Sequence, residues 1–328
     1  MQRRKLGKDG PEISVIGYGA WEAGVGYHSV HPPDEELIGA MRAAFDHGVT
    51  WVDTAEAYGA GRSEELVGQA VAGRDDIMVF TKVIFQPFGS GLDAAGIRAG
   101  AEASLRRLGR EVLDLYQIHL PDPQVPVEES WSAMAQLVDE GLVRYIGVSN
   151  FPPELVERCE WVRHVDSVQL HFSLLYREDY LSLLPLCQAN GIGILAYGPL
   201  GFGVLAGTMM PHTRFADDDW RSGNVPLPVP LYQQIFAPGR FEQHLRIVEA
   251  LRPIAQRTGL SIGAAGSGLG YSPGWRNGSD RRSTFGRPCH RGRQRRVDRV
   301  ECRGPRGRRR CVCRRGACRC GVILPSGS

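Results

Sequence analysis

Long apolar segments are missing from this sequence, and their absence excludes a protein that crosses a membrane with helices. No segment approaches the roughly 18 consecutive apolar residues that a transmembrane helix needs. The chain begins with a basic stretch, residues 1–5, but the apolar core of a secretory signal does not follow it. We therefore expect a cytoplasmic protein without membrane contact.

Lysine is absent from residues 266–328, and acidic residues are scarce there. This tail contains 17 arginines and three acidic residues, so its net charge is +14. Residues 1–265 contain 22 basic and 33 acidic residues, which gives a net charge of −11. Six of the eight cysteines also lie in the tail. The overall net charge of +3 therefore hides two compositions, which we interpret as a folded domain over 1–265 and a separate tail.

Residues 1–265 alternate between strand-like and helix-like patterns. The strand-like segments are short apolar runs without strict polar alternation, which is typical of parallel strands covered on both faces. They comprise residues 13–19, 49–53, 77–82, 113–119, 143–148, 167–170 and 192–197. Amphipathic helical patterns lie between them, over residues 33–48, 93–108, 127–140, 153–159 and 179–190, with one more that begins near Ser63 as its expected N-cap. Such repeats predict parallel strands joined by right-handed helical crossovers.

Two α/β architectures accommodate these repeats, a closed (β/α)8 TIM barrel and an open doubly wound sheet. The G-x-G-x-x-G turn that follows the first strand of a dinucleotide-binding doubly wound sheet is absent. We therefore predict the (β/α)8 TIM barrel, preceded by an N-terminal β-hairpin that Asp9-Gly10 indicates. Only seven strand-like segments precede residue 265, so the eighth strand and its helix are expected to be disrupted.

Polar residues end successive predicted strands. These residues are Asp53, Lys82, His119, Ser149 with Asn150, Gln169 and Tyr197. In a barrel they all project from the C-terminal rim, where enzymes of this fold keep their catalytic groups. Helix capping would account for Ser149 or Asn150 alone, but it does not explain an acid, a base and an imidazole on neighbouring strands.

Tyr58 lies in a glycine-rich loop five residues after Asp53 and is a candidate proton donor. A phenol with an ordinary pKa of about 10 is a poor acid or base at neutral pH. We expect the Lys82 ammonium to lower that pKa, with Asp53 holding Lys82 charged. His119 can orient a carbonyl or share the Tyr58 proton. Because no protein side chain donates hydride, such a site also implies a nicotinamide cofactor.

These segments resemble the aldo-keto reductases, a (β/α)8 family that uses NADPH. The resemblance covers about residues 4–265 and is carried by Val52–Gly59 (VDTAEAYG), Ser63–Gly68 (SEELVG), Thr81-Lys82, Leu108–Asp122 with its LDLYQIHLPD stretch, Ile146–Phe151 (IGVSNF) and Ala196–Gly203 (AYGPLGFG). It implies an oxidoreductase that reduces a small aldehyde or ketone to an alcohol by hydride transfer from NADPH. The alternatives are a non-catalytic nucleotide-binding barrel that couples to a partner, and an inactive product of a disrupted reading frame.

The resemblance also implies roles for individual residues. It implies a catalytic tetrad of Asp53, Tyr58, Lys82 and His119, with Tyr58 as the general acid and no metal ion. It further implies a cofactor site made of Gly19, Trp21, Ser149, Asn150, Gln169, Tyr197, Gly198, Leu200 and Gly203. In that site Ser149, Asn150 and Gln169 would hold the nicotinamide carboxamide, and Tyr197 would stack on the nicotinamide ring.

Three positions depart from the usual pattern of the family. His171-Phe172-Ser173-Leu174-Leu175 follows Gln169 where the family often has Tyr-Asn-Leu-Leu. Gly198 replaces a frequent serine after the stacking tyrosine, and Ala20 stands where a threonine is common. These differences concern contacts with the cofactor and leave the class of protein unchanged.

The tail, residues 266–328, allows three interpretations beyond the disorder that its composition predicts. Its basic cluster at 303–315 could neutralise nucleic-acid phosphates. Its C-x-C pairs offer four thiols, but zinc sites prefer C-x2-4-C spacing. A frame shift in a GC-rich gene explains the absence of lysine. When the tail is back-translated into permitted codons and these are read one base later, the result can contain a Thr-x-x-Ile-x-Gly strand, a Gly-x-Arg phosphate-binding turn and a final helix, in the order that the family has them. We favour the frame shift over nucleic-acid binding.

Restoring the shifted frame after about Ala265 is expected to raise both the melting temperature and the affinity for NADPH. Seven strands leave two sheet edges of a barrel unpaired, which is costly for buried backbone groups and favours aggregation. The phosphate-binding turn is restored by the same change. Both versions would be expressed, titrated with NADPH and melted. Equal affinities and equal melting temperatures would show that the basic tail is a genuine part of this protein.

Overall fold

The computed structural model describes most of the chain up to residue 264 and two short segments beyond it. The described ranges are 1–24, 32–225, 234–264, 301–304 and 307–310. The chain forms two compact units, Met1–Arg276 and Asn277–Ser328. Among the described residues, no helix is long and apolar enough to cross a membrane.

The second unit contains a short antiparallel strand pair. Strands β10 (Glu301–Gly304) and β11 (Gly307–Arg310) pair with Glu301 opposite Arg310. This pair adds local structure to a tail that its composition predicts to be disordered. The other residues of 266–328 lie outside the described residues, so the proposed frame shift, the nucleic-acid tail and the cysteine site stay predictions.

The first unit contains a nearly closed barrel of seven parallel strands, which confirms the predicted fold class. Each strand pairs in parallel with the next along the chain. The strands are β3 (Tyr18–Gly19), β4 (Trp51–Asp53), β5 (Met78–Val83), β6 (Leu113–Ile118), β7 (Val143–Ser149), β8 (Ser167–His171) and β9 (Gly193–Tyr197). Within the described residues, no strand pairs with the outer edges of β3 and β9. The predicted disruption of the eighth strand and its helix concerns residues beyond 265, which lie outside the described part of this barrel.

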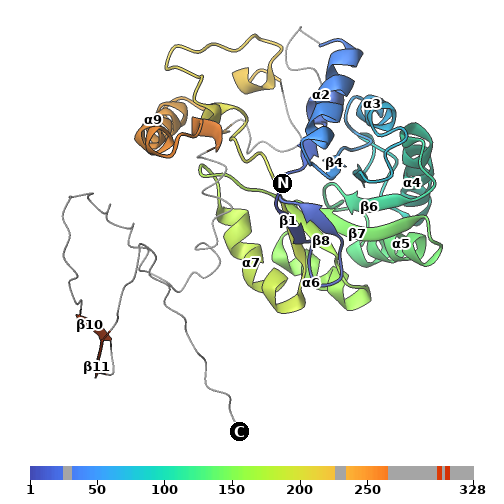
Figure 1. Cartoon of the computed structure of the whole chain (residues 1–328). Coiled ribbons are helices and arrows are strands. Elements are labelled where there is room, and N and C mark those ends of the chain that lie inside the picture. The colour runs from blue at the N-terminus through green and yellow to red at the C-terminus, as the bar shows by residue number, and fades with distance from the viewer. Residues whose placement is uncertain (25–31, 226–233, 265–300, 305–306, 311–328) are drawn as a thin grey trace. The chain divides into compact units, whose positions relative to one another are not determined.

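Helices connect the strands and cover the outside of the barrel (Figure 1). The connecting helices are α1 (Trp21–Gly24), α2 (Asp34–Asp46), α3 (Arg62–Ala70), α4 (Ala94–Leu108), α5 (Val127–Asp139), α6 (Pro153–Val162) and α7 (Glu178–Asn190). The short 3-10 turns η1 (Val204–Ala206) and η2 (Trp220–Ser222) and helix α9 (Arg240–Thr258) follow β9, and α9 packs with η1 in a separate apolar cluster. Asp93 caps α4 by accepting from the main-chain N–H of Gly96 at 2.7 Å, as its position before the helix predicts.

The structure differs from the sequence prediction at two helices, in the N-cap of α3 and in the presence of α9. Ser63 does not cap α3, because Gly61 precedes that helix in a left-handed conformation. The Ser63 hydroxyl instead donates to the carbonyl oxygen of Ala20 at 2.7 Å. Helix α9 has no counterpart among the predicted helices, although its buried residues Phe241, Leu245, Val248, Leu251 and Ala255 recur at helical spacing.

The N-terminal hairpin is confirmed, but its turn differs from the prediction. Strands β1 (Arg3–Lys5) and β2 (Glu12–Ser14) pair antiparallel, so residues 13 and 14 belong to the hairpin and not to the first barrel strand. A two-residue turn at Asp9-Gly10 would place Lys8 opposite Pro11, which has no N–H to donate. The main-chain N–H of Leu6 instead donates to the carbonyl oxygen of Pro11 at 2.9 Å, which closes a longer loop.

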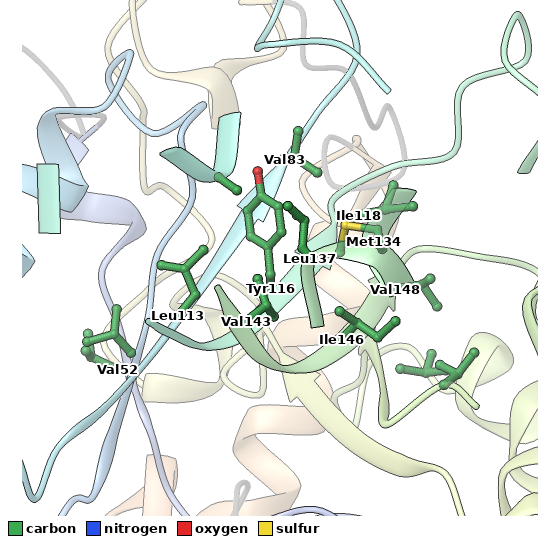
Figure 2. Packing of buried hydrophobic residues seen from close by; sticks show 14 of the residues in the cluster. Val52, Val83, Leu113, Tyr116, Ile118, Met134, Leu137, Val143, Ile146 and Val148 are labelled. Carbon is green, nitrogen blue, oxygen red and sulfur yellow. The ribbon is translucent and has the colours of Figure 1, made fainter. Parts of the chain in front are cut away.

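The alternation of side chains along each strand separates an outer core from an inner one. Val52, Tyr116 and Val148 point outward and share one buried cluster with Met134 and Leu137 of α5 (Figure 2). The intervening residues point into the barrel. This outer cluster holds the helices on the sheet and so fixes which strand positions face the barrel axis.

The inner core is apolar at the N-terminal end of the barrel. Trp51 and Phe80 stack with ring centroids 4.9 Å apart and pack with Leu115. Leu6 and Ile13 of the hairpin join the same cluster, so the hairpin covers this end. The next inward position on each strand lies two residues further along, one layer closer to the C-terminal rim.

Candidate active site

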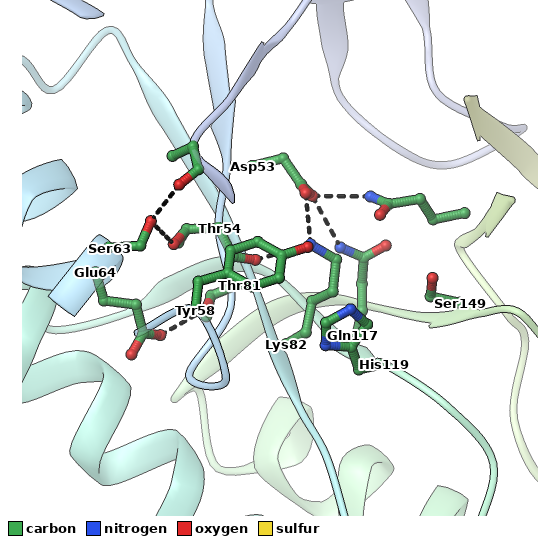
Figure 3. Close-up of polar contacts among 12 residues, drawn as sticks. Asp53, Thr54, Tyr58, Ser63, Glu64, Thr81, Lys82, Gln117, His119 and Ser149 are labelled. Atoms are coloured by element: carbon green, nitrogen blue, oxygen red, sulfur yellow. Dashed lines mark hydrogen bonds and ion pairs between the residues drawn. The ribbon is translucent and has the colours of Figure 1, made fainter. Parts of the chain in front are cut away.

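The inward positions at the C-terminal ends of the strands carry the polar residues that the sequence predicts. Asp53 ends β4, and Lys82 follows the inward-facing Phe80 by two residues on β5. His119 comes directly after β6, two residues after Gln117. Because residues two apart on a strand share a face, the tetrad residues on these strands converge on the barrel axis. Tyr58 joins them from the loop after β4 (Figure 3).

A buried ion pair lies at the centre of the site. Lys82 Nζ donates to Asp53 Oδ1 at 2.5 Å and to the carbonyl oxygen of Thr54 at 2.8 Å. The Lys82 side chain has no exposed surface, and 14% of the Asp53 side chain is exposed. Burial lowers the pKa of Lys82, while the charge and the hydrogen bond of Asp53 act in the opposite direction. Asp53 therefore keeps the ammonium charged in a place where an unpaired charge would be costly.

Tyr58 presents a protonated phenol next to this ion pair. Its hydroxyl lies 3.5 Å from Lys82 Nζ, and its ring meets the His119 ring edge-on with centroids 5.5 Å apart. Burial, and then the Asp53 carboxylate, raise the pKa of Tyr58 well above its usual value. The expected lowering of this pKa by Lys82 is therefore wrong for this structure, because burial disfavours the phenolate and Asp53 opposes the ammonium. A neutral phenol at pH 7 suits a proton donor.

His119 is a neutral imidazole at physiological pH. Burial, and secondarily the Lys82 charge, lower the pKa of His119 to about 3. Its Nδ1 is buried and has no hydrogen-bond partner among the described residues. A neutral imidazole donates from one ring nitrogen and accepts at the other, so His119 can orient the oxygen of a carbonyl group.

The predicted carboxamide-binding residues are connected to the tetrad. Asn150, which has a positive φ of 58°, donates from Nδ2 to Ser149 Oγ at 3.0 Å and to the carbonyl oxygen of His119 at 3.1 Å. Its Oδ1 accepts a hydrogen bond from the Tyr197 hydroxyl at 2.6 Å. Gln169 Nε2 donates to Asp53 Oδ2 at 2.8 Å. The structure thus gathers two amides, a hydroxyl and an aromatic ring around one side of the tetrad.

The remaining residues predicted for the cofactor lie in the connections after β3 and β9. Gly19 ends β3 opposite Asp53, and a Cβ atom there would meet no atom within 4 Å. Trp21 begins α1 and contacts Phe202, with ring centroids 6.2 Å apart. The last three predicted residues occupy the loop after β9, where Gly198 and Gly203 have positive φ and the Leu200 carbonyl oxygen accepts from the N–H of Gly203. Their contacts with a cofactor stay predictions.

Two inward-facing residues of the site are absent from the sequence prediction. Gln117 Nε2 approaches Asp53 Oδ2 at 3.4 Å, while its Oε1 is buried without a partner among the described residues. His171 follows Gln169 by two residues on β8 and is fully buried. The two-residue period of a strand could have identified them from the sequence. Gln117 shares a strand face with His119, and His171 shares one with Gln169.

The geometry and the fold together define a TIM-barrel enzyme with an acid–base site at its C-terminal rim. Within the described ranges, no group of three or more histidine, cysteine, aspartate or glutamate residues could hold a metal ion. The tetrad brings together one phenol, one ammonium, one imidazole and one carboxylate.

Comparisons with known proteins agree with this class. Residues 15–265 match the profile of the Aldo/keto reductase family. Aldo-keto reductase YhdN of Bacillus subtilis is 37% identical over 270 residues, which cover 80% of this chain and 78% of that protein. The glycerol dehydrogenase AKR11B4 from Gluconobacter oxydans is 33% identical, with a TM-score of 0.69 over 80% of both chains. An aldo-keto reductase from Klebsiella pneumoniae in complex with NADPH is 34% identical, with a TM-score of 0.55 over 64% of this chain and 72% of that one.

The chain therefore belongs to the aldo/keto reductase family and is an oxidoreductase.

Removing one partner of the Asp53–Lys82 pair is expected to destabilise the fold more than removing both. Asp53→Asn or Lys82→Met alone leaves a buried charge without its counterion and should reduce the free energy of unfolding by about 3 kcal/mol. The double variant should lie within about 1 kcal/mol of the wild type. Urea unfolding of the four proteins measures the coupling. Additive losses in the double variant would contradict a coupled pair.

Acidification should destabilise the protein through His119. The folded-state pKa is lowered to about 3, so the unfolded state binds the additional proton first as the pH falls below about 6.5. The stability present at pH 7 is thus lost progressively on acidification, by about 2 kcal/mol at pH 5. Urea unfolding at several pH values should show a weaker pH dependence for His119→Asn. Identical pH dependences of variant and wild type would contradict the buried neutral imidazole.

Proposed function

We propose that this protein reduces an aldehyde or ketone to an alcohol, with NADPH as the hydride donor and Tyr58 as the general acid. One observation carries the proposal: the protonated Tyr58 phenol lies beside the charged Lys82 and the neutral His119 at the barrel rim. A proton donor, a charge that stabilises its conjugate base and a group that orients a carbonyl oxygen are what this reduction requires of a protein.

The residues around the tetrad fit a nicotinamide. The amides of Asn150 and Gln169 and the hydroxyl of Ser149 can donate to and accept from a carboxamide, and Tyr197 offers a ring for stacking. Gly19 leaves room at the rim, since a side chain there would point into open space. NADPH supplies the hydride when it is bound. The relative from Klebsiella pneumoniae in complex with NADPH supports the choice of cofactor.

In the proposed reaction, three residues have separate roles in proton transfer: Tyr58, Lys82 and His119. His119 donates a hydrogen bond to the carbonyl oxygen and so holds it near the Tyr58 hydroxyl. Tyr58 gives its proton to that oxygen as negative charge develops there, and the O–H bond of the phenol breaks. The Lys82 ammonium, 3.5 Å from the phenol oxygen, then stabilises the phenolate that remains. Asp53 keeps Lys82 charged throughout.

Replacing Tyr58 by phenylalanine is expected to abolish most of the reduction while cofactor binding survives. The variant keeps the ring and loses only the proton donor, and general acid catalysis contributes about 10²–10⁴-fold in rate. The rate of NADPH oxidation would be measured with one aromatic and one aliphatic aldehyde. NADPH binding would be measured separately by quenching of protein fluorescence.

Tyr116→Phe is the matched control for this experiment. Tyr116 is also a buried tyrosine, but it lies on the outer face of β6, and its hydroxyl has no partner among the described residues (Figure 2). This variant should keep the wild-type turnover. Turnover of Tyr58→Phe near that of the wild type would contradict the assignment of Tyr58. A wild-type protein that binds NADPH but turns over neither aldehyde would favour the non-catalytic nucleotide-binding barrel.

A further inference from the structure

Three aromatic rings stack behind the predicted nicotinamide site. His171 and Tyr197 are direct neighbours in the register of β8 and β9. Their ring centroids are 5.5 Å apart at an interplanar angle of 21°. The His171 ring also stacks on Tyr176, at 4.9 Å and 12°. The imidazole is thus the middle member of the stack, and it is fully buried.

The two tyrosines of the stack are anchored by their hydroxyl groups. The Tyr197 hydroxyl donates to Asn150 Oδ1 at 2.6 Å. The Tyr176 hydroxyl donates to Asp179 Oδ1 at 2.8 Å, in the first turn of α7. A hydroxyl contact fixes the end of a tyrosine side chain but leaves its ring able to tilt. The His171 ring lies against one face of the Tyr197 ring and so limits how far that ring can tilt.

The backbone beside the stack is shaped to admit the imidazole. Gly198 has a φ of +64°, and a Cβ atom there would lie 3.0 Å from His171 Cδ2 and 3.1 Å from its Nε2. A side chain at position 198 would therefore press against the His171 ring. The absence of a side chain at Gly198 thus leaves room for the His171 ring.

The His171 ring is neutral at physiological pH. Burial lowers the pKa of His171 to about 4, in spite of the Glu178 charge that acts in the opposite direction. A neutral ring behind Tyr197 leaves the electron-rich face of the tyrosine able to attract a positively charged ring. An oxidised nicotinamide carries such a charge.

We propose that His171 is a positioning residue that sets the plane of the Tyr197 ring and thereby the affinity of the barrel for the nicotinamide end of its cofactor. The inference rests on the proposed function, because it requires a nicotinamide to stack on Tyr197. His171 lies against one face of the Tyr197 ring and so holds the plane of that ring. His171 itself acts through Tyr197 and does not touch the cofactor.

Two substitutions in the full chain separate the role of the ring from that of its volume. His171→Leu keeps an apolar side chain of similar size but removes the stacking surface. We expect this variant to raise the Kd for NADPH and for NADP⁺ about 3- to 10-fold, the range that one aromatic pair contributes. His171→Phe restores a neutral ring and should stay within about 2-fold of the wild type. Fluorescence quenching gives the Kd values, and thermal melting shows whether each variant is folded.

A double variant distinguishes positioning from a general loss of structure. In a Tyr197→Leu background the ring that His171 positions is gone, so adding His171→Leu should leave the Kd unchanged. A further increase in Kd would overturn the proposal, because His171 would then act by another route. If His171→Leu does not fold, His171→Asn replaces it with the same expectations.

Cofactor binding by the wild-type protein distinguishes a failure of this inference from a failure of the proposed function. A wild type that binds NADPH, with an equal Kd for His171→Leu, would overturn the positioning role alone. A wild type that binds neither NADPH nor NADP⁺ would overturn the proposed function, and the inference with it. Binding that weakens in His171→Leu and recovers in His171→Phe supports both.

Discussion

The buried charge of Lys82 is the constraint on which the rest of the active site depends. An ammonium without exposed surface persists only because Asp53 and the Thr54 carbonyl oxygen compensate for lost hydration. Its charge contributes to the low pKa of His119, and its counterion contributes to the high pKa of Tyr58. A single desolvated ion pair therefore helps to keep two neighbouring side chains in their neutral forms.

The apolar packing at the N-terminal end of the barrel keeps water from reaching the ion pair from that end. Trp51, Phe80 and Leu115 fill the layer under the tetrad, and the N-terminal hairpin covers the end of the barrel beneath them. The amides of Gln117 and Gln169 approach the second carboxylate oxygen of Asp53 from neighbouring strands. Apolar packing thus supports the polar layer from below, and hydrogen bonds from the barrel wall hold the Asp53 carboxylate.

Asn150 connects the tetrad with Tyr197 by hydrogen bonds. Its amide group donates to the carbonyl oxygen of His119 and accepts from the Tyr197 hydroxyl, so one side chain holds both residues (Figure 3 shows the tetrad). Trp21, from the connection after β3, contacts Trp220, from the connection after β9, with ring centroids 6.0 Å apart. Side chains therefore join the two connections whose strands, β3 and β9, are not paired with each other.

Local sequence patterns were sufficient to predict the barrel class and the residues at the strand ends. Apolar runs recur at regular spacing, and polar residues stand where each run stops. Lys82 and His119 could be assigned to the site on that basis. The tertiary structure alone decided that the pKa of Tyr58 rises, since burial and the distance to a counterion are properties of the folded chain. It also decided that Ser63 bonds a distant loop instead of capping a helix, and that His171 supports Tyr197, because strand register joins segments that no local pattern connects.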